Sequence, residues 1–421
     1  MSDLGVVIVD EEHEASYKQE QSPRYHARQV AIRRAIASGA TVVLGSATPS
    51  LESYYWAEQG KYALVEMPTR VEERPLPTVE VVSLQRRRRD GSVRALGYVL
   101  RERMAETLAR GEQVMLLHNR RGFASFLICT ACGHLPRCPR CEISFTFHAS
   151  PARMVCHYCL YETSPPSSCQ GCGGFEMTHQ GAGTQRVEEE VMEAFPGVPL
   201  LRMDRDTTRQ MSDHRRLLEQ FANREAQILI GTQMIAKGHD FPDVTLVGVV
   251  LADTGLALPD FRAAERTFSL LTQVAGRAGR GRVPGRVVIQ TYNPEHYAIR
   301  HAAAQGYGGF YAEELAARKE LEYPPFTHLI NVILSGESGA DVERAAQAMG
   351  SRMRAQVAAM PCVLLGPAPC ALPRIHRKSR WHLVFKCRQV QEIMPLIRTY
   401  LRENASAGVS AAVDADPMSM L

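Results

Sequence analysis

Short apolar runs rich in β-branched residues alternate with longer amphipathic segments along most of the chain. Apolar runs that end abruptly at polar or turn residues are typical of buried parallel strands, and the amphipathic segments are typical of helices. In the first part this pattern predicts a strand at 5–9, a helix near 26–37, a strand at 41–48 and short strands at 62–66 and 78–84.

The same alternation continues through the middle of the chain, where a cysteine-rich segment interrupts it. It predicts helices near 98–110, 186–195, 213–223 and 262–276, and strands at 113–118, 199–203, 227–232, 244–250 and 286–292. Because strand–helix alternation builds parallel sheets with helices on both faces, we expect a doubly wound α/β fold here.

The consecutive prolines of EYPPF, residues 322–326, mark a boundary in this alternation. Beyond them the pattern predicts a strand at 328–335, a helix at 340–358, strands at 362–365 and 381–387, and a helix at 390–404. The resulting βαββα order indicates a small ferredoxin-like α+β domain at the end of the chain.

Composition places the 421 residues among ordinary globular proteins of several domains, with 45% hydrophobic and 22% charged residues. No apolar stretch reaches the roughly 18–20 residues that a membrane span needs, and the acidic N-terminus does not resemble a secretory signal. We therefore expect a cytoplasmic protein without a membrane partner. A net charge of +4 does not by itself single out nucleic acid as a ligand.

Eight of the eleven cysteines form four CxxC pairs within a short stretch. Four thiolates in a tetrahedral arrangement are the usual structural home of Zn²⁺, and a reducing compartment favours metal binding over disulfides. Scattered buried or redox-active cysteines would rarely show this spacing. The pairs are Cys129 and Cys132, Cys138 and Cys141, Cys156 and Cys159, and Cys169 and Cys172.

The spacing of the pairs also favours one way of sharing them between two zinc ions. The 14 residues between the second and third pairs read as strand–turn–strand, and such a hairpin would bring those two pairs face to face. The first and fourth pairs would then close an outer site. The prediction is zinc 1 on Cys129, Cys132, Cys169 and Cys172, and zinc 2 on Cys138, Cys141, Cys156 and Cys159. With every position filled by thiolate, zinc catalysis is not expected.

The acidic DEEH that follows the first predicted strand fits a nucleotide site. A carboxylate at the end of a buried strand can hold Mg²⁺, and its neighbour can orient and deprotonate the water that attacks a γ-phosphate. Asp10 and Glu11 are the candidates for these roles, and His13 would link the nucleotide state to its neighbours. Acidic residues commonly end strands, so this motif has little specificity alone.

Three further segments resemble motifs of superfamily-2 helicases. An arginine pair between glycines could equally be a solvated helix end, but four motifs in helicase order are hard to obtain by chance. The expected roles are coupling of hydrolysis to DNA movement for Ser46 and Thr48 of LGSATPS, contact with nucleotide or DNA for Thr232 and Lys237 of GTQMIAKGHDF, nucleotide contact for Gln273 and arginine-finger roles for Arg277 and Arg280 of QVAGRAGR.

The resemblance narrows to the PriA family of replication-restart helicases. DEEHEASYKQE, RYHAR, LHNRRG, RMDRDTT, DFRAAERT and EYPPF are similar to segments of that family, as is an insertion of eight paired cysteines. The similarity runs from about Leu4 to beyond Trp381. It implies ATP and Mg²⁺ as cofactors beside two zinc ions, 3′-to-5′ movement along single-stranded DNA and unwinding of forks. Implied partners are single-strand binding protein and primosomal proteins.

The family also has an aromatic-rich loop after DEEH that senses DNA. The matching residues here are Tyr17, Tyr25 and His26, and stacking of bases on aromatic rings would account for the role. The alternative is that the tyrosines merely pack against the first motor lobe. Pro23 stands in this loop where the family usually has an aromatic residue.

These observations predict a partial RecA-like lobe, a complete RecA-like helicase lobe with an inserted two-zinc segment, and a ferredoxin-like C-terminal domain. The expected limits are 1–68 for the remnant of lobe 1, 69–310 for lobe 2 with the insertion at about 125–180, and 311–421 for the C-terminal domain.

No GxxxxGK[ST] motif, the loop that cradles nucleotide phosphates, occurs in the sequence. We therefore expect the chain to begin midway through the first lobe and to lack ATPase activity on its own. A truncated or misassigned start and a short protein that has lost its motor would both explain this. The contrasting hypothesis is a non-enzymatic, zinc-containing module that binds DNA or primosomal proteins.

Overall fold

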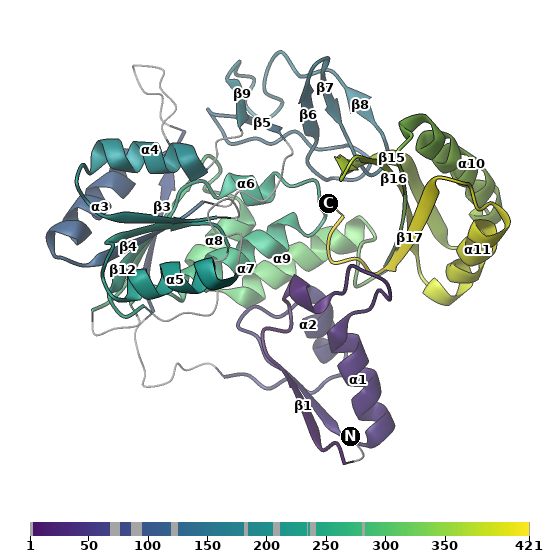
Figure 1. The fold of residues 1–421 in the computed structure, drawn as a ribbon, viewed down its shortest axis with the longest axis horizontal. Helices are drawn as coiled ribbons and strands as arrows, with labels where there is room; N and C mark the ends of the chain where they lie inside the picture. The colour runs from purple at the N-terminus through teal and green to yellow at the C-terminus, as the bar shows by residue number, and fades with distance from the viewer. Residues whose placement is uncertain are drawn as a thin grey trace.

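The computed structural model describes residues 3–67, 76–85, 95–118, 125–180, 184–204, 211–233, 235, 241–279 and 283–420. Figure 1 shows an α/β domain on the left, the cysteine-rich insertion above, the C-terminal domain on the right and the N-terminal segment below. The C-terminus lies among these parts, near the centre of the view. Within the described residues, no helix is both long and apolar enough to cross a membrane.

The N-terminal segment is a two-stranded parallel sheet with two helices. It contains β1 (Val6–Val9), the short helix η1 (Ala15–Tyr17), α1 (Ala27–Ser38), β2 (Thr41–Leu44) and α2 (Leu51–Glu58). The first three predicted elements are confirmed. The predicted strand at 62–66 is wrong: Leu64 and Val65 are exposed and pair with no strand, so their β propensity has no partner to satisfy it.

The central sheet has six parallel strands in the order β10-β11-β4-β12-β13-β3. β4, β11 and β12 are buried along their whole length, as strands covered on both faces must be. The strands are β3 (Thr78–Ser83), β4 (Gln113–Leu117), β10 (Leu200–Met203), β11 (Ile228–Gly231), β12 (Val244–Val249) and β13 (Arg286–Thr291).

Helices cover both faces of this sheet, which confirms the doubly wound prediction. Leu100 and Val187, from two helices, pack on one face, while Phe221 and Phe268, from two others, pack on the opposite face. The helices are α3 (Tyr98–Ala109), α4 (Thr184–Ala194), α5 (Met211–Ala222), α6 (Asp253–Leu256), α7 (Ala263–Ala275), α8 (Tyr297–Ala303) and α9 (Tyr307–Glu320). Of the predicted domain limits, the one at 310/311 falls inside α9, and the limits remain predictions.

The insertion leaves and rejoins the α/β domain through two antiparallel strands, β5 (Phe126–Cys129) and β9 (Met177–Gln180). Between them, β6 (Thr146–Ala149) and β7 (Ala152–Val155) form the hairpin that the sequence predicts, and β8 (Glu162–Thr163) extends it. The hairpin holds the second and third cysteine pairs on either side of it.

The C-terminal domain has the ferredoxin-like topology. Its four antiparallel strands lie in the order β15-β16-β14-β17 and two helices, α10 and α11, contribute to its core. Sequence analysis missed the last strand, whose VSAAVDA sequence has little hydrophobic patterning. The elements are β14 (His328–Gly336), α10 (Gly339–Val357), β15 (Cys362–Ile375), β16 (Lys378–Cys387), α11 (Val390–Glu403) and β17 (Val409–Ala415).

A buried histidine on β16 contacts the cysteine-rich insertion. Its titration makes the stability of the contact between the C-terminal domain and the insertion dependent on pH. The His382 Nε2–H donates to the carbonyl of His157 over 2.5 Å, and burial lowers the pKa of His382 from 6.5 to about 4. Because the folded pKa lies below the unfolded one, its contribution is complete above pH 6.5 and is lost as the pH falls toward 4.

Between pH 7 and pH 5 we expect the wild-type chain to lose about 2 kcal/mol more stability than His382→Gln, which keeps a hydrogen-bond donor without titrating. Urea unfolding at the two pH values measures the difference. His376→Gln, at an exposed turn, is the matched control. Identical pH dependence in the wild type and His382→Gln would contradict the assignment.

Candidate zinc centres and motor site

All four CxxC pairs adopt the same backbone loop. In each, the N–H four residues after the first cysteine donates to that cysteine's carbonyl, and the first cysteine's N–H donates to the carbonyl five residues on. The residue four positions after the first cysteine always has a positive φ, which turns the chain back beneath the two thiols. These residues are Gly133 (φ 74°), Glu142 (φ 54°), Leu160 (φ 61°) and Gly173 (φ 73°).

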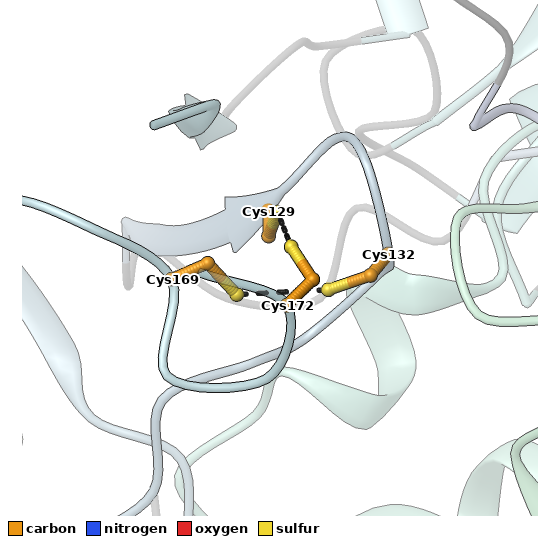
Figure 2. A group of neighbouring side chains, drawn as sticks. All are labelled: Cys129, Cys132, Cys169 and Cys172. Atoms are coloured by element: carbon orange, nitrogen blue, oxygen red, sulfur yellow. Dashed lines mark hydrogen bonds between the residues drawn. The ribbon is translucent and has the colours of Figure 1, made fainter. Parts of the chain in front are cut away.

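The loops bring the eight thiols together as two groups of four. Cys129, Cys132, Cys169 and Cys172 form an outer group, shown in Figure 2, and Cys138, Cys141, Cys156 and Cys159 form an inner group. Within each group all sulfur atoms lie within 4.8 Å of one another. The nested sharing of the pairs is therefore the arrangement that the structure has.

The sulfur spacing fits tetrahedral zinc. Four sulfurs at about 2.3 Å from a central ion would lie about 3.8 Å apart. The Sγ–Sγ distances are 3.8 Å for Cys129–Cys172, 3.6 Å for Cys132–Cys169 and 3.7 Å for Cys138–Cys159. A zinc ion in each group would supply folding energy and leave no open position for substrate.

The thiols also need a cation for electrostatic reasons. Burial raises the pKa of Cys132 to about 12, whereas hydrogen bonds with Cys138, Cys141 and Cys156 hold the pKa of Cys159 well below its usual value. One thiolate in the inner group is thus stabilised by its neighbours, whereas four adjacent thiolates would need a bound cation between them.

The two groups differ in their surroundings. The inner cysteines belong to an apolar cluster with Tyr158 of the same insertion, Tyr323 of EYPPF, and Leu329 and Val384 of the C-terminal domain. In the outer group Cys172 is exposed, and nearby Phe175 is 81% exposed. The inner group therefore forms part of the core between two domains, whereas the outer group has one exposed cysteine and lies outside that core.

His13 joins three of the motifs that the sequence singles out. Its Nδ1 lies 2.7 Å from the Ser46 hydroxyl, and its Nε2 accepts from the side-chain amide of Gln273 at 2.9 Å. With Nε2 accepting, Nδ1 carries the proton and donates it to Ser46. The Thr48 N–H also donates to the Ser46 hydroxyl, at 2.9 Å. The DEEH, SAT and QVAGRAGR motifs thus meet at the imidazole of His13.

The two candidate catalytic carboxylates follow β1 directly. Asp10 is exposed and accepts from the Glu11 N–H at 2.9 Å, and Glu11 has a positive φ of 46°. Thr232 directly follows β11, and Arg277 lies in the turn after α7. The predicted contacts of Lys237 and Arg280 lie outside the described residues.

The loop predicted to sense DNA contacts the C-terminal domain through Lys18. The Tyr17 hydroxyl donates to the Asp10 carbonyl at 2.7 Å, whereas Tyr25 is 45% exposed. Between them, Lys18 donates to the Ala415 carbonyl at 2.7 Å and pairs with Asp414. His26 is the N-cap residue of α1, and burial followed by the charge of Arg28 lowers its pKa to about 4.

Sequence analysis missed Glu12, the second glutamate of DEEH. Its side chain is buried, forms an ion pair with Arg28, and accepts from the Ser50 N–H at 2.6 Å and the Ser53 hydroxyl at 3.0 Å. It thereby connects β1, α1 and α2. The sequence alone does not show that Glu12 is buried, because the residues that pair with it are brought into contact only by the fold.

The sequence matches three family models. "Primosomal protein N C-terminal domain" matches residues 319–418, "PriA DNA helicase Cys-rich region (CRR) domain" matches 138–163, and "Helicase conserved C-terminal domain" matches 178–282. The first two are specific to one family and cover the ferredoxin-like domain and the inner cysteines.

Curated relatives match along the whole chain. Replication restart protein PriA of Bacillus subtilis is 45% identical over 99% of this chain and 52% of its own length. The Synechocystis and Treponema pallidum proteins of the same name are each 40% identical, over 100% and 99% of this chain and 51% and 63% of theirs. The chain thus spans about half the length of the first relatives.

Similarity to solved structures is weaker. Yeast Dbp5 bound to RNA and ADP BeF3 is 12% identical with a TM-score of 0.37, over 76% of this chain and 62% of Dbp5, and adds nothing to the assignment. The cysteine spacing, the topology and the sequence relatives all indicate the same family. By these criteria the chain belongs to the PriA family of replication restart proteins.

Proposed function

We propose that the chain is the part of an ATP-dependent 3′-to-5′ DNA helicase that holds the second motor lobe, the zinc insertion and the C-terminal domain. It would act in replication restart and primosome assembly at stalled forks. The observation that carries the proposal is the contact of His13 with Ser46 and Gln273, which brings three helicase motifs together across 260 positions of sequence.

Each motif residue has a role in this proposal. The carboxylates after β1 would serve Mg²⁺ and the attacking water, and the hydroxyls of the SAT motif would couple hydrolysis to movement. The assigned roles are Mg²⁺ and water for Asp10 and Glu11, coupling for His13, Ser46 and Thr48, nucleotide or DNA contact for Thr232, Lys237 and Gln273, and transition-state charge for Arg277 and Arg280.

The partners follow from the family. The DNA would be forked and single-stranded, and single-strand binding protein and primosomal proteins would dock on the assembled enzyme in the cytoplasm. Two structural zinc ions would hold the insertion. Tyr17, Tyr25 and His26 would report DNA to the motor, with Lys18 linking their loop to the C-terminal domain.

A second candidate function is a binding module that contains zinc and does not hydrolyse ATP. The observation in its favour is the absence of GxxxxGK[ST] from the 421 residues. Without a loop to hold the phosphates, the carboxylates after β1 have little nucleotide on which to act. Both candidates predict binding to DNA, and they differ in turnover.

DNA-stimulated ATP hydrolysis by this chain can reject the second candidate. Because the 421 residues contain no GxxxxGK[ST], we expect no turnover above background but measurable binding to a fluorescent forked oligonucleotide. Clear turnover that Glu11→Gln abolishes would reject the binding-only candidate. Glu343→Gln, at an exposed position of α10, is the matched control. No binding to forked or single-stranded DNA would contradict both candidates.

A further inference from the structure

The DFRAAERT motif, residues 260–267, has no role in the function proposed above, yet it leads into α7, whose last turn holds Gln273. Its side chains point into a buried junction. Arg262 donates two hydrogen bonds to Glu52 of α2, at 2.6 and 3.1 Å. Glu265 accepts from the backbone N–H of Leu51 at 3.0 Å. The start of α7 is therefore bonded directly to the segment that follows the SAT motif.

A third helix completes the junction. Arg318 of α9 pairs with Glu265 at 2.7 Å and with Glu314 at 2.8 Å, and Arg262 also pairs with Glu265 at 3.0 Å. Both guanidinium groups lie over the ring of Phe261, at 4.8 and 5.1 Å. Charge-assisted and bidentate contacts of this kind fix geometry as well as adding energy.

The junction is buried and is built from ionisable side chains. The side chains of Arg262 and Arg318 are 5% and 2% exposed. Burial opposes ionisation of Glu265, but Arg318 and Arg262 hold its pKa well below its usual value. Removing one member would leave the others as uncompensated buried charges, which is far more costly than losing an exposed pair.

The other end of α7 touches the N-terminal segment a second time. Gln273 lies eleven residues after Arg262, about 17 Å along the helix at 1.5 Å per residue, and there it donates to His13. This second contact is a single hydrogen bond. One rigid helix thus meets the N-terminal segment twice, through a strong buried junction at its start and a weak contact at its end.

We infer that Arg262 and Glu265 are positioning residues of the motor, because by fixing the start of α7 against Leu51 and Glu52 they set where Gln273 meets His13. The inference rests on the proposed function only in treating the His13 contact as part of the nucleotide site.

The test reads the hydrogen bonding of the His13 ring in the 421-residue chain labelled with ¹⁵N-histidine, with His13→Gln identifying its signals. In Arg262→Gln we expect the two ring nitrogens to move from one fixed tautomer toward the averaged positions of an exchanging imidazole. Amide exchange around residues 12–14 and 272–276 should become roughly tenfold faster. Arg300→Gln, which breaks an exposed pair with Glu313, is the control and should change neither signal.

A folded Arg262→Gln variant with unchanged His13 signals would overturn the inference. If that variant does not fold, Glu52→Gln carries the same test, because Arg262 keeps its pairing with Glu265 and the buried charge is smaller. Its His13 signals must move, and unchanged signals reject the inference. Neither measurement needs nucleotide or DNA. A failure of the proposed function can therefore be distinguished from a failure of this inference.

Discussion

Replacing Cys156 with serine is expected to disrupt the joint between the zinc insertion and the C-terminal domain, whereas replacing Cys172 should leave it intact. Cys156 is buried in the apolar cluster that includes Tyr323, Leu329 and Val384, so its zinc group is part of an interdomain core. Structural zinc supplies on the order of 10–16 kcal/mol, and we expect Cys156→Ser to lower the free energy of unfolding by on the order of 5 kcal/mol or more.

Metal analysis and unfolding together check this expectation. Each variant should retain about one zinc ion per chain instead of two, because each loses one of four ligands at one centre. Urea unfolding of the C-terminal domain is followed by Trp381 on β16, in a Trp56→Phe background that removes the other tryptophan. Cys370→Ser, at a buried cysteine outside both groups, is the control. Equal destabilisation by Cys156→Ser and Cys172→Ser would contradict the assignment.

Glu12→Ala should unfold the N-terminal segment. The substitution leaves Arg28 buried without a counter-charge and removes the acceptor of the Ser50 N–H, and breaking such a buried pair costs about 3–5 kcal/mol. The segment is only a two-stranded sheet with two helices. A loss of stability of that size should therefore be enough to unfold it.

Hydrogen exchange measured by mass spectrometry over residues 5–60 checks this second expectation, since global unfolding would be dominated by the rest of the chain. Glu11→Ala is the matched control: its side chain is 47% exposed, and it should leave exchange in α1 and α2 unchanged. Under the proposed function Glu11 serves chemistry and Glu12 serves structure. Slow exchange in Glu12→Ala would refute that division.

The features that local sequence patterns determine are the ones that sequence analysis predicted. Alternating apolar runs predict the central sheet because each strand is buried by its own helices, and CxxC spacing predicts both zinc groups because the ligands lie within a short stretch. Gly133 and Gly173 fit the positive φ of their loops, but Glu142 and Leu160 adopt the same backbone without that signal. The sequence therefore indicates the loop geometry at only two of the four cysteine pairs.

What sequence analysis missed depends on contacts between distant residues. The strand predicted at 62–66 has the right composition but no neighbour to pair with, whereas β17 has weak patterning and forms because β14 offers a free edge. Likewise, nothing local distinguishes Glu12 from Glu11, or the buried Arg262 from a solvated arginine. Their roles depend on Arg28 and Glu52, which the fold alone brings into contact.

The run of α9 across residue 311 matters to anyone who wishes to divide the chain for expression. A fragment starting at 311 would begin in the middle of α9. It would contain Arg318 without Glu265, so this buried ion pair would be lost. A fragment stopping at 310 would keep Glu265 but lose Arg318. A cut at Pro324, after the helix has ended, leaves the whole of α9 with the piece that it helps to fold.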